Sequence, residues 1–195
     1  NQACTISMEE QQIFEDEAVH LFAENAPAGA RNGYKAGSFA QRTGATVLRI
    51  ASSDTTRSAA RENNKHYGQL RRVVHLVRDA PVMIISNMRT ELGIVNGTVG
   101  KLKAVVLHPG AAEDDGGVRK AVHADKVRYI VLDVPQYKGP AFWTEHPTWV
   151  PVPPVQVRHS TKKMWHRTQL PVVLAWGVTI HKCQSLTFPL HAVVD

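Results

Sequence analysis

The stretch LPVVLAWGVTIHKCQSLT, residues 170–187, passes directly from an apolar run into a cluster of polar side chains. Its apolar part, residues 172–176, is typical of a strand buried on both faces, as in a parallel sheet covered by helices. Thr179 follows where a helix would begin, and free N–H groups and the helix dipole at such a junction favour an anion. His181, Lys182 and Gln184 add side-chain donors. The stretch predicts a phosphate-binding turn in an α/β domain, and ordinary polar capping of a strand end is the alternative.

The length and charge of the chain indicate how many domains it has and what kind of partner it binds. Its 195 residues suffice for one to two domains. Lys and Arg number 23 against 17 Asp and Glu, a net charge of +6, and the pI is about 9.5. This balance favours a polyanionic partner such as nucleic acid. The two cysteines, Cys4 and Cys183, have no CxxC spacing, which argues against a disulfide framework or a cysteine zinc site and fits a reducing compartment.

No apolar run approaches the roughly 20 residues needed to cross a bilayer. We therefore expect a soluble, intracellular protein without a membrane partner. The chain does not begin with Met and shows no signal-peptide pattern, so we expect it to be the interior of a longer polypeptide, as a fragment or a truncated gene product.

The first third of the chain carries short strand-like runs separated by polar segments. Residues 18–22 and 45–54 are expected to contain strands, and residues 26–38 are Gly- and Ala-rich loop or helix start. Residues 55–72 are polar and basic throughout, which predicts a solvated helix or a mobile insertion.

The middle of the chain has an all-β pattern. Residues 81–86 form a continuous apolar strand, and Asn96-Gly97 between apolar runs is a strong hairpin signal because both residues tolerate positive φ. Residues 139–157 are rich in Pro and Trp, which suits short edge strands. We predict a small inserted β-barrel over residues 88–170, flanked by buried strands of one parallel sheet.

A basic segment near the end of this region is a second candidate site. Its composition suits phosphates and stacked bases, although a solvated loop on a basic protein has the same composition. The predicted DNA-binding residues here are Lys162, Lys163, Trp165 and Arg167. The sequence contains no GxxxxGK[ST], GxGxxG or HExxH motif, so we predict no catalytic residue and no metal ligand in this chain.

Several stretches resemble one family of enzymes. LAWGVTIHKCQSLT is similar to the motif LAWAxTIHKSQGLT of the PIF/RecD-like superfamily-one DNA helicases, a family that includes the Helitron-type helicases. PVMIISNMRTELGIVNGTVGKL resembles the segment PVMLLxNLxxxxGLVNGTRGxV, and RTQLPVVLAW resembles RxQxPLxLAW. VHLFAENA is similar to the strand LFxTNxxV that opens the second, C-terminal RecA-like lobe. The resemblance covers most of the chain from about Val19 onward.

The resemblance implies an incomplete RecA-like parallel-sheet lobe with an inserted small SH3-like β-barrel. The expected division is residues 1–87 for the first part of the lobe, 88–170 for the barrel and 171–195 for the resumed lobe. By analogy, Thr179, His181 and Lys182 would contact phosphates of single-stranded DNA, and Gln184 and Ser185 would lie near the nucleotide. Cys183 and Ser185 replace the Ser and Gly of the family motif, and Ser185 removes a residue free to take positive φ.

The function implied is the second motor lobe of an ATP-dependent DNA helicase. ATP and Mg²⁺ would bind in the complete enzyme, against the N-terminal RecA-like lobe of the same polypeptide, and neither would bind to this chain alone because its Walker motifs are missing. Such a helicase would serve DNA repair, recombination and telomere maintenance, in the nucleus or mitochondrion of a eukaryote. A non-enzymatic module that binds single-stranded nucleic acid and an inactive transposon remnant are the alternatives.

Overall fold

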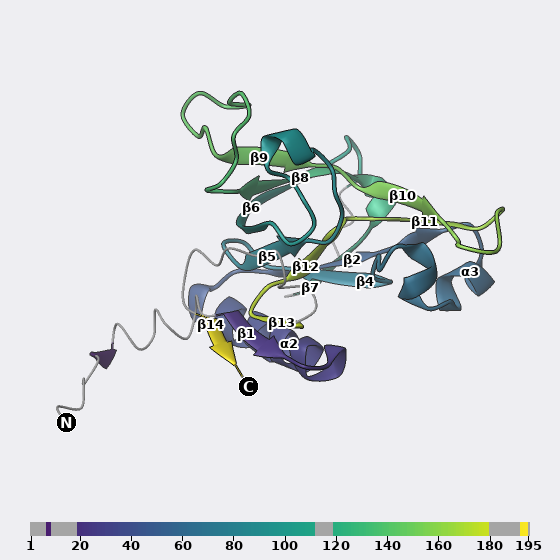
Figure 1. Ribbon diagram of the computed structural model, residues 1–195, viewed down its shortest axis with the longest axis horizontal. Helices are drawn as coiled ribbons and strands as arrows, with labels where there is room; N and C mark the ends of the chain where they lie inside the picture. The colour runs from purple at the N-terminus through teal and green to yellow at the C-terminus, as the bar shows by residue number, and fades with distance from the viewer. Residues whose placement is uncertain (1–6, 9–18, 112–118, 180–191, 195) are drawn as a thin grey trace.

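The computed structural model describes residues 7–8, 19–111, 119–179 and 192–194. These residues form a mixed α/β structure with four small sheets. Figure 1 shows helix α2 and a parallel sheet at the bottom, the other sheets above them, and an arm that ends at α3 on the right. No helix in these residues is long and apolar enough to cross a membrane.

The parallel sheet has the order β13-β1-β14. Its central strand β1 (Val19–Phe22) pairs in parallel with β13 (Gly177–Thr179) and with β14 (Ala192–Val194). Helix α2 (Asn25–Thr43) begins directly after β1 and packs on β1 and β13. This is the α/β arrangement expected of a RecA-like lobe, and the strand predicted at residues 18–22 is confirmed.

Helix α2 includes residues 26–38, for which the sequence predicted either a loop or the start of a helix. Its buried face consists mainly of small side chains, Ala28, Ala36 and Ala40, which let the helix lie close to the sheet. It ends at Gly44, which takes the left-handed conformation at φ 68° that favours glycine. Packing of the alanine face on the sheet therefore stabilises the helix in spite of its three interior glycines.

The largest sheet has five antiparallel strands in the order β12-β5-β6-β8-β9. These strands are β12 (Val172–Leu174), β5 (Pro81–Ile84), β6 (Val99–Leu107), β8 (Val127–Asp133) and β9 (Trp149–Val152). The sheet is open: among the described residues no closed barrel is found. Asn96-Gly97 does form a turn, in which the N–H of Thr98 donates to the carbonyl of Val95 at 3.0 Å, but the strand paired with β6 is β5 rather than the residues just before the turn.

The flanking strands correct one expectation. Residues 81–84 and 172–174 pair with each other in an antiparallel register, Val82 opposite Leu174, and extend the sheet of the predicted insertion. The chain then bends at Ala175 and Trp176 and enters the parallel sheet as β13. Residues 172–176 are therefore not one strand of a parallel sheet. Thr179 lies at the end of β13, and the predicted start of a helix after it falls outside the described residues.

Two further three-stranded sheets complete the fold. One has the order β4-β2-β7, with β4 (Val73–Leu76), β2 (Val47–Ala51) and β7 (Arg119–His123). The other has the order β10-β11-β3, with β10 (Val155–Arg158), β11 (His166–Gln169) and β3 (Ser53–Asp54). Short helices α3 (Arg57–Arg61), η1 (Asn64–Tyr67), η2 (Thr90–Leu92) and η3 (Ala124–Lys126) join these strands.

One hydrophobic core connects most of the elements. Its buried residues come from α2, from the five-stranded sheet and from the sheet β4-β2-β7, and Trp176 at the bend is fully buried, with its ring tilted against Phe39 of α2 at 5.4 Å. The polar segment 55–72 is packed as well, because Ala59, Tyr67 and Leu70 are buried. Tyr67 and Leu70 belong to a second hydrophobic cluster, against which Val155 and Val157 of β10 pack. That segment is a packed element rather than a solvated helix or a mobile insertion.

Candidate nucleic-acid interface

The first candidate site lies at the carboxyl edge of the parallel sheet. β1 and β13 end side by side there, with Phe22 opposite Thr179, and α2 begins three residues after Phe22. Glu24, the N-cap residue of α2, makes no side-chain capping bond, so the first N–H groups of the helix have no cap from that side chain. Strand ends beside a helix N-terminus form the kind of edge at which α/β proteins bind phosphates.

The structure places one of the predicted motif residues at this edge. Thr179 is the last residue of β13 and is 4% exposed. His181, Lys182, Gln184 and Ser185 lie outside the described residues. Their contacts with phosphate or nucleotide therefore stay predictions.

Asn32 of α2 holds β13 in place, and sequence reasoning missed this residue. Its side-chain amide donates to the carbonyl of Gly177 at 2.7 Å, and its Oδ1 accepts the N–H of Gly177 at 2.9 Å. A Cβ on Gly177 would lie 2.8 Å from the carbonyl oxygen of Ala28, so only glycine allows this approach of helix and strand. Asn32 therefore binds both the N–H and the carbonyl of Gly177 and fixes β13, the strand that leads into the motif. The only sequence signal for this role was the spacing of Asn32, a polar residue four positions after Ala28 and so on the same side of the helix.

The basic segment of the second candidate site lies in the hairpin of β10 and β11, and one of its predicted residues is structural. Arg167 is fully buried. Its Nε donates to Asp54 at 2.8 Å, and its Nη1 donates to the side chain of Asn64 at 2.7 Å and to the carbonyl of Leu70 at 3.0 Å. The guanidinium also lies over the ring of Tyr67, 4.4 Å from its centroid. The prediction that Arg167 contacts DNA is wrong, because all of its donors are directed into the protein.

The other three predicted residues are at the surface of the hairpin tip. Lys162 lies over the ring of Trp165, 4.1 Å from its centroid, and also donates to Glu62. Trp165 is half-buried by these neighbours, whereas Lys163 is exposed. Lys163 is therefore the cation of this segment with the clearest access to a phosphate, while Lys162 is shared with a carboxylate.

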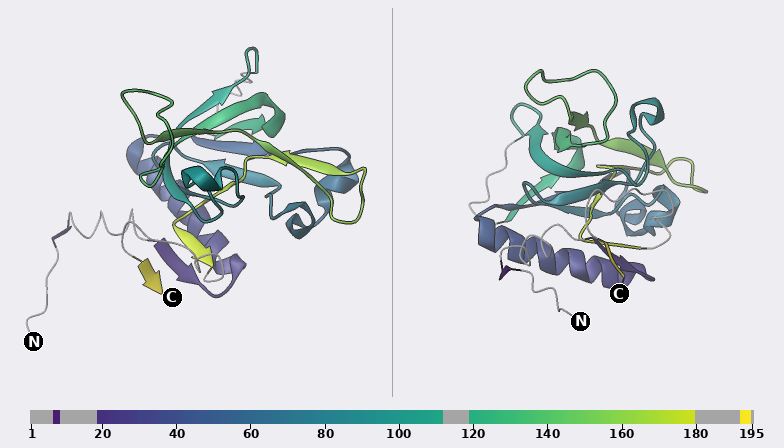
Figure 2. Two further views of the ribbon diagram at one scale, coloured as in Figure 1. Left: turned by 45° about the horizontal axis from the view of Figure 1, so that its top comes forward. Right: turned by 60° about the vertical axis from the view of Figure 1, so that its left-hand side comes forward.

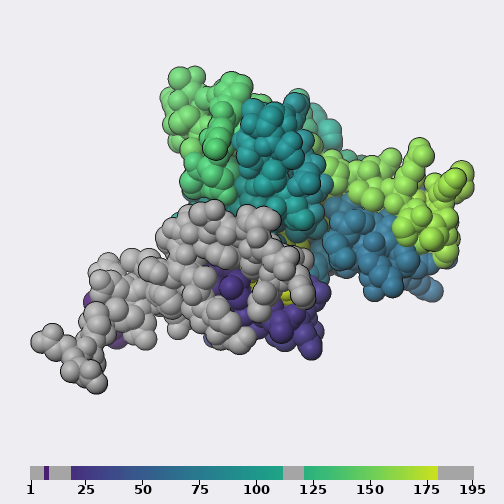
Figure 3. Space-filling view, viewed as in Figure 1, coloured from purple at the N-terminus to yellow at the C-terminus, as the bar shows by residue number. Residues whose placement is uncertain are grey.

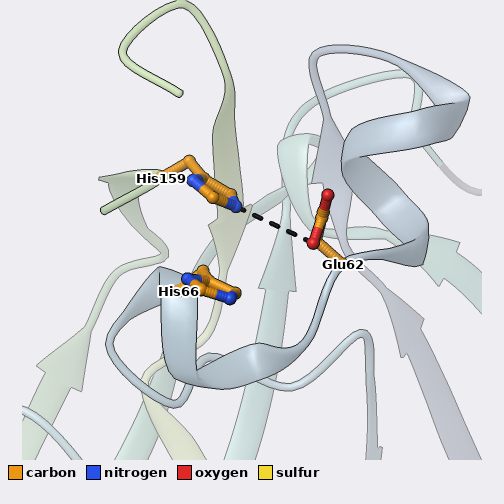
Figure 4. A group of neighbouring side chains, drawn as sticks. All are labelled: Glu62, His66 and His159. Carbon is orange, nitrogen blue, oxygen red and sulfur yellow. Dashed lines mark ion pairs between the residues drawn. The ribbon is translucent and has the colours of Figure 1, made fainter. Parts of the chain in front are cut away.

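Glu62, His66 and His159 form a cluster at the hairpin tip (Figure 4). The rings of His66 and His159 stack at 4.5 Å, and Nε2 of His159 lies 3.9 Å from Oε2 of Glu62. Nδ1 of His159 accepts the N–H groups of Thr161 and Lys162 at 3.1 and 3.0 Å. The proton of a neutral His159 is therefore on Nε2 and faces Glu62.

The electrostatics of the cluster follow from burial and from Lys162. Burial lowers the pKa of His159, and the adjacent His66 ring lowers it further. The hydrogen bond from Lys162 lowers the pKa of Glu62. Near neutral pH the cluster thus contains a carboxylate between a lysine ammonium and the N–H of a neutral imidazole.

The same three residues each offer one ligand atom within 4.8 Å of the others, as a metal site would. The hydrogen bonds argue for a different role. A metal ion needs the lone pair of Nε2, but the two backbone donors at Nδ1 force the proton onto Nε2. The ammonium of Lys162 also shares the carboxylate that a cation would need. This geometry supports a clasp that joins α3 and η1 to the hairpin.

The two candidate sites are far apart on the molecule. Figures 1 and 2 show the tip of the hairpin at one end of the arm, next to α3, and β13 beside α2 on a different side. A cavity of about 390 Å³ between α2, β4 and β12 includes Asn32 in its lining, but none of the predicted DNA-binding residues in the described part of the chain. Thr179 and the Trp165 segment therefore do not form one contiguous site in the described structure.

Comparisons with known proteins give a match of fold. No family model matches the sequence, and no curated relative matches it. Solved structures do match, at 16–23% identity among the most similar. The structure of Pif1 helicase from Candida albicans is 23% identical, with a TM-score of 0.62, over 92% of this chain and 38% of that one.

Two Bacteroides structures match over similar lengths. Pif1 in complex with ADP-AlF3 and single-stranded DNA is 17% identical, with a TM-score of 0.58, over 100% of this chain and 36% of that one. Unliganded Pif1 is 18% identical, with a TM-score of 0.55, over 93% of this chain and 47% of that one. The chain thus spans less than half the length of the structures that it matches, and it shares the fold of that part.

Proposed function

We propose that this chain, which has the fold of a Pif1-like helicase domain, is the second motor lobe of an ATP-dependent DNA helicase. In this role it grips single-stranded DNA and couples that grip to ATP bound between it and the N-terminal RecA-like lobe of the same polypeptide. The observation that supports the proposal most is the parallel sheet, in which β13, with the sequence GVT, ends at the carboxyl edge beside the start of α2. The residues that follow Thr179 in the sequence are those of the proposed grip.

The chemistry of the grip divides between charge and hydrogen bonding. Lys182 supplies a fixed positive charge to a phosphate, and His181 supplies a hydrogen-bond donor. Thr179 at the end of β13 positions both, because β13 is tied to α2 through Gly177 and Asn32. Gln184 and Ser185 lie nearer the nucleotide in this proposal, so that closure of the lobes on ATP shifts the grip on the strand.

The antiparallel region is the proposed counterpart of the SH3-like barrel of such helicases. The insertion, residues 88–170, supplies the six strands β6 to β11, and the lobe comprises residues 1–87 and 171–195. Strands β5 and β12, from the two flanks, extend the sheet of the insertion. The insertion is therefore joined to the lobe through shared strands rather than through a flexible linker.

ATP and Mg²⁺ belong to the complete helicase in this proposal. A phosphate-cradling Walker loop and an acidic Mg²⁺ site are needed for phosphoryl transfer, and the 195 residues contain neither motif. Pure chain should show no ATPase above background, with or without DNA, and turnover stimulated by DNA would contradict this part of the proposal. In a eukaryote the helicase would act in the nucleus or mitochondrion, in DNA repair, recombination and telomere maintenance.

A salt titration tests the DNA grip. Affinity for a labelled single-stranded oligonucleotide should fall steeply with salt, and Lys182→Ala should reduce the log-log slope by about one because one phosphate contact is lost. His181→Ala should weaken binding with less effect on the slope, since a neutral imidazole carries no fixed charge. Ser185→Gly, near the nucleotide, is the matched control and should leave DNA binding unchanged. Equal slopes for the original chain and Lys182→Ala would remove Lys182 from the site.

A further inference from the structure

A chain of aromatic rings lies on the long loop between β8 and β9, residues 134–148, and on the start of β9. Adjacent rings have centroids 3.8–6.5 Å apart, from Tyr137 through Phe142 and Trp143 to Trp149 and His146. Figures 1 and 3 show this loop protruding at the upper left, at the opposite end of the molecule from α3. The rings belong to neither of the two candidate sites described above.

The loop is held in one conformation by its own hydrogen bonds. The hydroxyl of Tyr137 donates to the carbonyl of Pro140 at 3.0 Å, and the N–H of Lys138 donates to the carbonyl of Leu92 at 3.2 Å. Within the second half of the loop, the N–H of His146 donates to the carbonyl of Trp143 at 3.0 Å. A Cβ on Gly139 would lie 2.2 Å from the Tyr137 hydroxyl, so glycine is needed for the ring to cover this turn. The rings are therefore pre-positioned rather than free to collapse.

One ring of the chain remains open to solvent. Phe142 is 54% exposed, although Tyr137 lies on one side of it and Trp143 on the other. An exposed phenyl ring forgoes the stabilisation that burial of its apolar surface would give. A rigid loop that holds such a ring outward is typical of a contact surface.

The chemistry around Phe142 favours a nucleobase as the occupant. The exposed residues beside the rings are one lysine, one glutamate, one histidine, a glutamine, a threonine, an alanine and three prolines. The surface therefore offers ring faces and short apolar side chains without net fixed charge. Nucleobases bind by stacking on such faces, and every base has a π-face. The remainder of this chain, at +6 overall, supplies the attraction for phosphates.

We infer that this aromatic loop is a second contact surface for single-stranded nucleic acid, on which an unpaired base stacks against Phe142. The inference rests on the proposed function and extends it, because it adds a contact made through bases to a grip made through phosphates. Two consequences follow: binding at the loop needs unpaired bases, and it does not depend on salt in the way that a phosphate contact does.

The test compares Phe142→Ala with Tyr34→Ala, which removes an aromatic ring that is 71% exposed on α2. Both variants should unfold at the temperature of the original chain, since each removed ring is at the surface. Phe142→Ala should weaken binding of a single-stranded oligonucleotide by about five-fold or more, with an unchanged salt slope. Tyr34→Ala should bind as the original chain does. An oligonucleotide whose central bases are replaced by abasic sites should bind the original chain and Phe142→Ala equally.

The outcomes separate this inference from the proposed function. If the original chain binds the strand and Phe142→Ala binds it equally well, the aromatic loop is not a contact surface while the helicase proposal stands. The inference would also be overturned if Phe142→Ala and Tyr34→Ala lost affinity for the single strand equally. It would be overturned as well if the original chain bound a duplex as tightly as a single strand. If the original chain binds no single strand at all, the proposed function fails, and this inference fails with it.

Discussion

Nε of Arg167 on β11 donates to Oδ1 of Asp54 on β3 at 2.8 Å, and both side chains are almost completely buried. The pair joins residues 113 positions apart in the chain and fixes the hairpin of β10 and β11 on the segment that contains α3 and η1. A buried charge needs such partners, because an isolated ion in the interior would be strongly unfavourable.

Replacing Arg167 by Met should destabilise the protein by about 3–5 kcal/mol, because it leaves the buried Asp54 carboxylate without its partner. Urea unfolding measures the change. Arg158→Met, at an exposed position of β10 in the same hairpin, is the control and should have an effect within about 0.5 kcal/mol. If the two variants were equally stable, the ion pair would not be what fixes the hairpin.

Gly177→Ala should destabilise the protein by about 1–3 kcal/mol, because the added methyl group would overlap the carbonyl of Ala28 and push α2 from the sheet. Gly33→Ala, on the open side of α2, meets no atom within 4 Å and should instead stabilise by about 0.5–1 kcal/mol through helix propensity. Thermal unfolding of the two variants should therefore shift in opposite directions. A gain of stability in Gly177→Ala would contradict the close packing of α2 on β13.

Lys163→Ala should reduce the salt slope of DNA binding more than Lys162→Ala does. Lys163 is exposed, whereas Lys162 already interacts with Glu62 and with the Trp165 ring. The expected reduction for Lys163→Ala is about one, and titration at several salt concentrations measures it. A larger effect of Lys162→Ala would mean that its ion pair opens when DNA binds.

Stability should fall as the pH drops below about 6.5, the ordinary pKa of histidine. Burial lowers the pKa of His159 in the folded state. Below about pH 6.5 the unfolded chain therefore binds a proton at His159 that the folded chain does not bind, which favours unfolding. A second loss should begin below about 4.5, because the lowered pKa of Glu62 stabilises the fold only while its carboxylate is charged. Denaturant unfolding at pH 7.5, 5.5 and 4.0 measures both.

Two variants isolate the first of these losses. His159→Asn should remove much of the decrease between pH 7.5 and 5.5, whereas His108→Asn, at an exposed histidine, should retain it. An identical decrease in His159→Asn and in the original chain would show that other groups carry the pH dependence.

Deleting residues 88–170 and closing the gap should give a chain that does not unfold cooperatively. The deletion removes the strand β6 that pairs with β5, and it removes core residues of β6, β8 and β9 that pack in one cluster with α2. Circular dichroism during thermal unfolding checks this. A sharp transition would mean that the parallel sheet and α2 fold without the insertion.

Local sequence patterns determined many of the strands and the likeness to the helicases. Apolar runs predicted β1, β2 and β5, because burial of β-branched and aliphatic side chains is encoded in short windows. The Asn96-Gly97 turn followed in the same way, since its positive φ is a local property, with Gly97 at 96°. The motif of residues 174–187 indicated the fold that the matched structures share.

Only the tertiary structure decided which strands pair and which charged residues are buried. Strand type does not specify the partner, so the antiparallel pairing of β5 with β12 and the bend at Trp176 depended on packing across the whole core. Arg167, Lys162 and Lys163 look alike in a basic segment, yet Asp54, Glu62 and open solvent give them three different roles. These partners lie 100 or more residues away in sequence, and a contact of that range is set by the folded chain rather than by neighbouring residues.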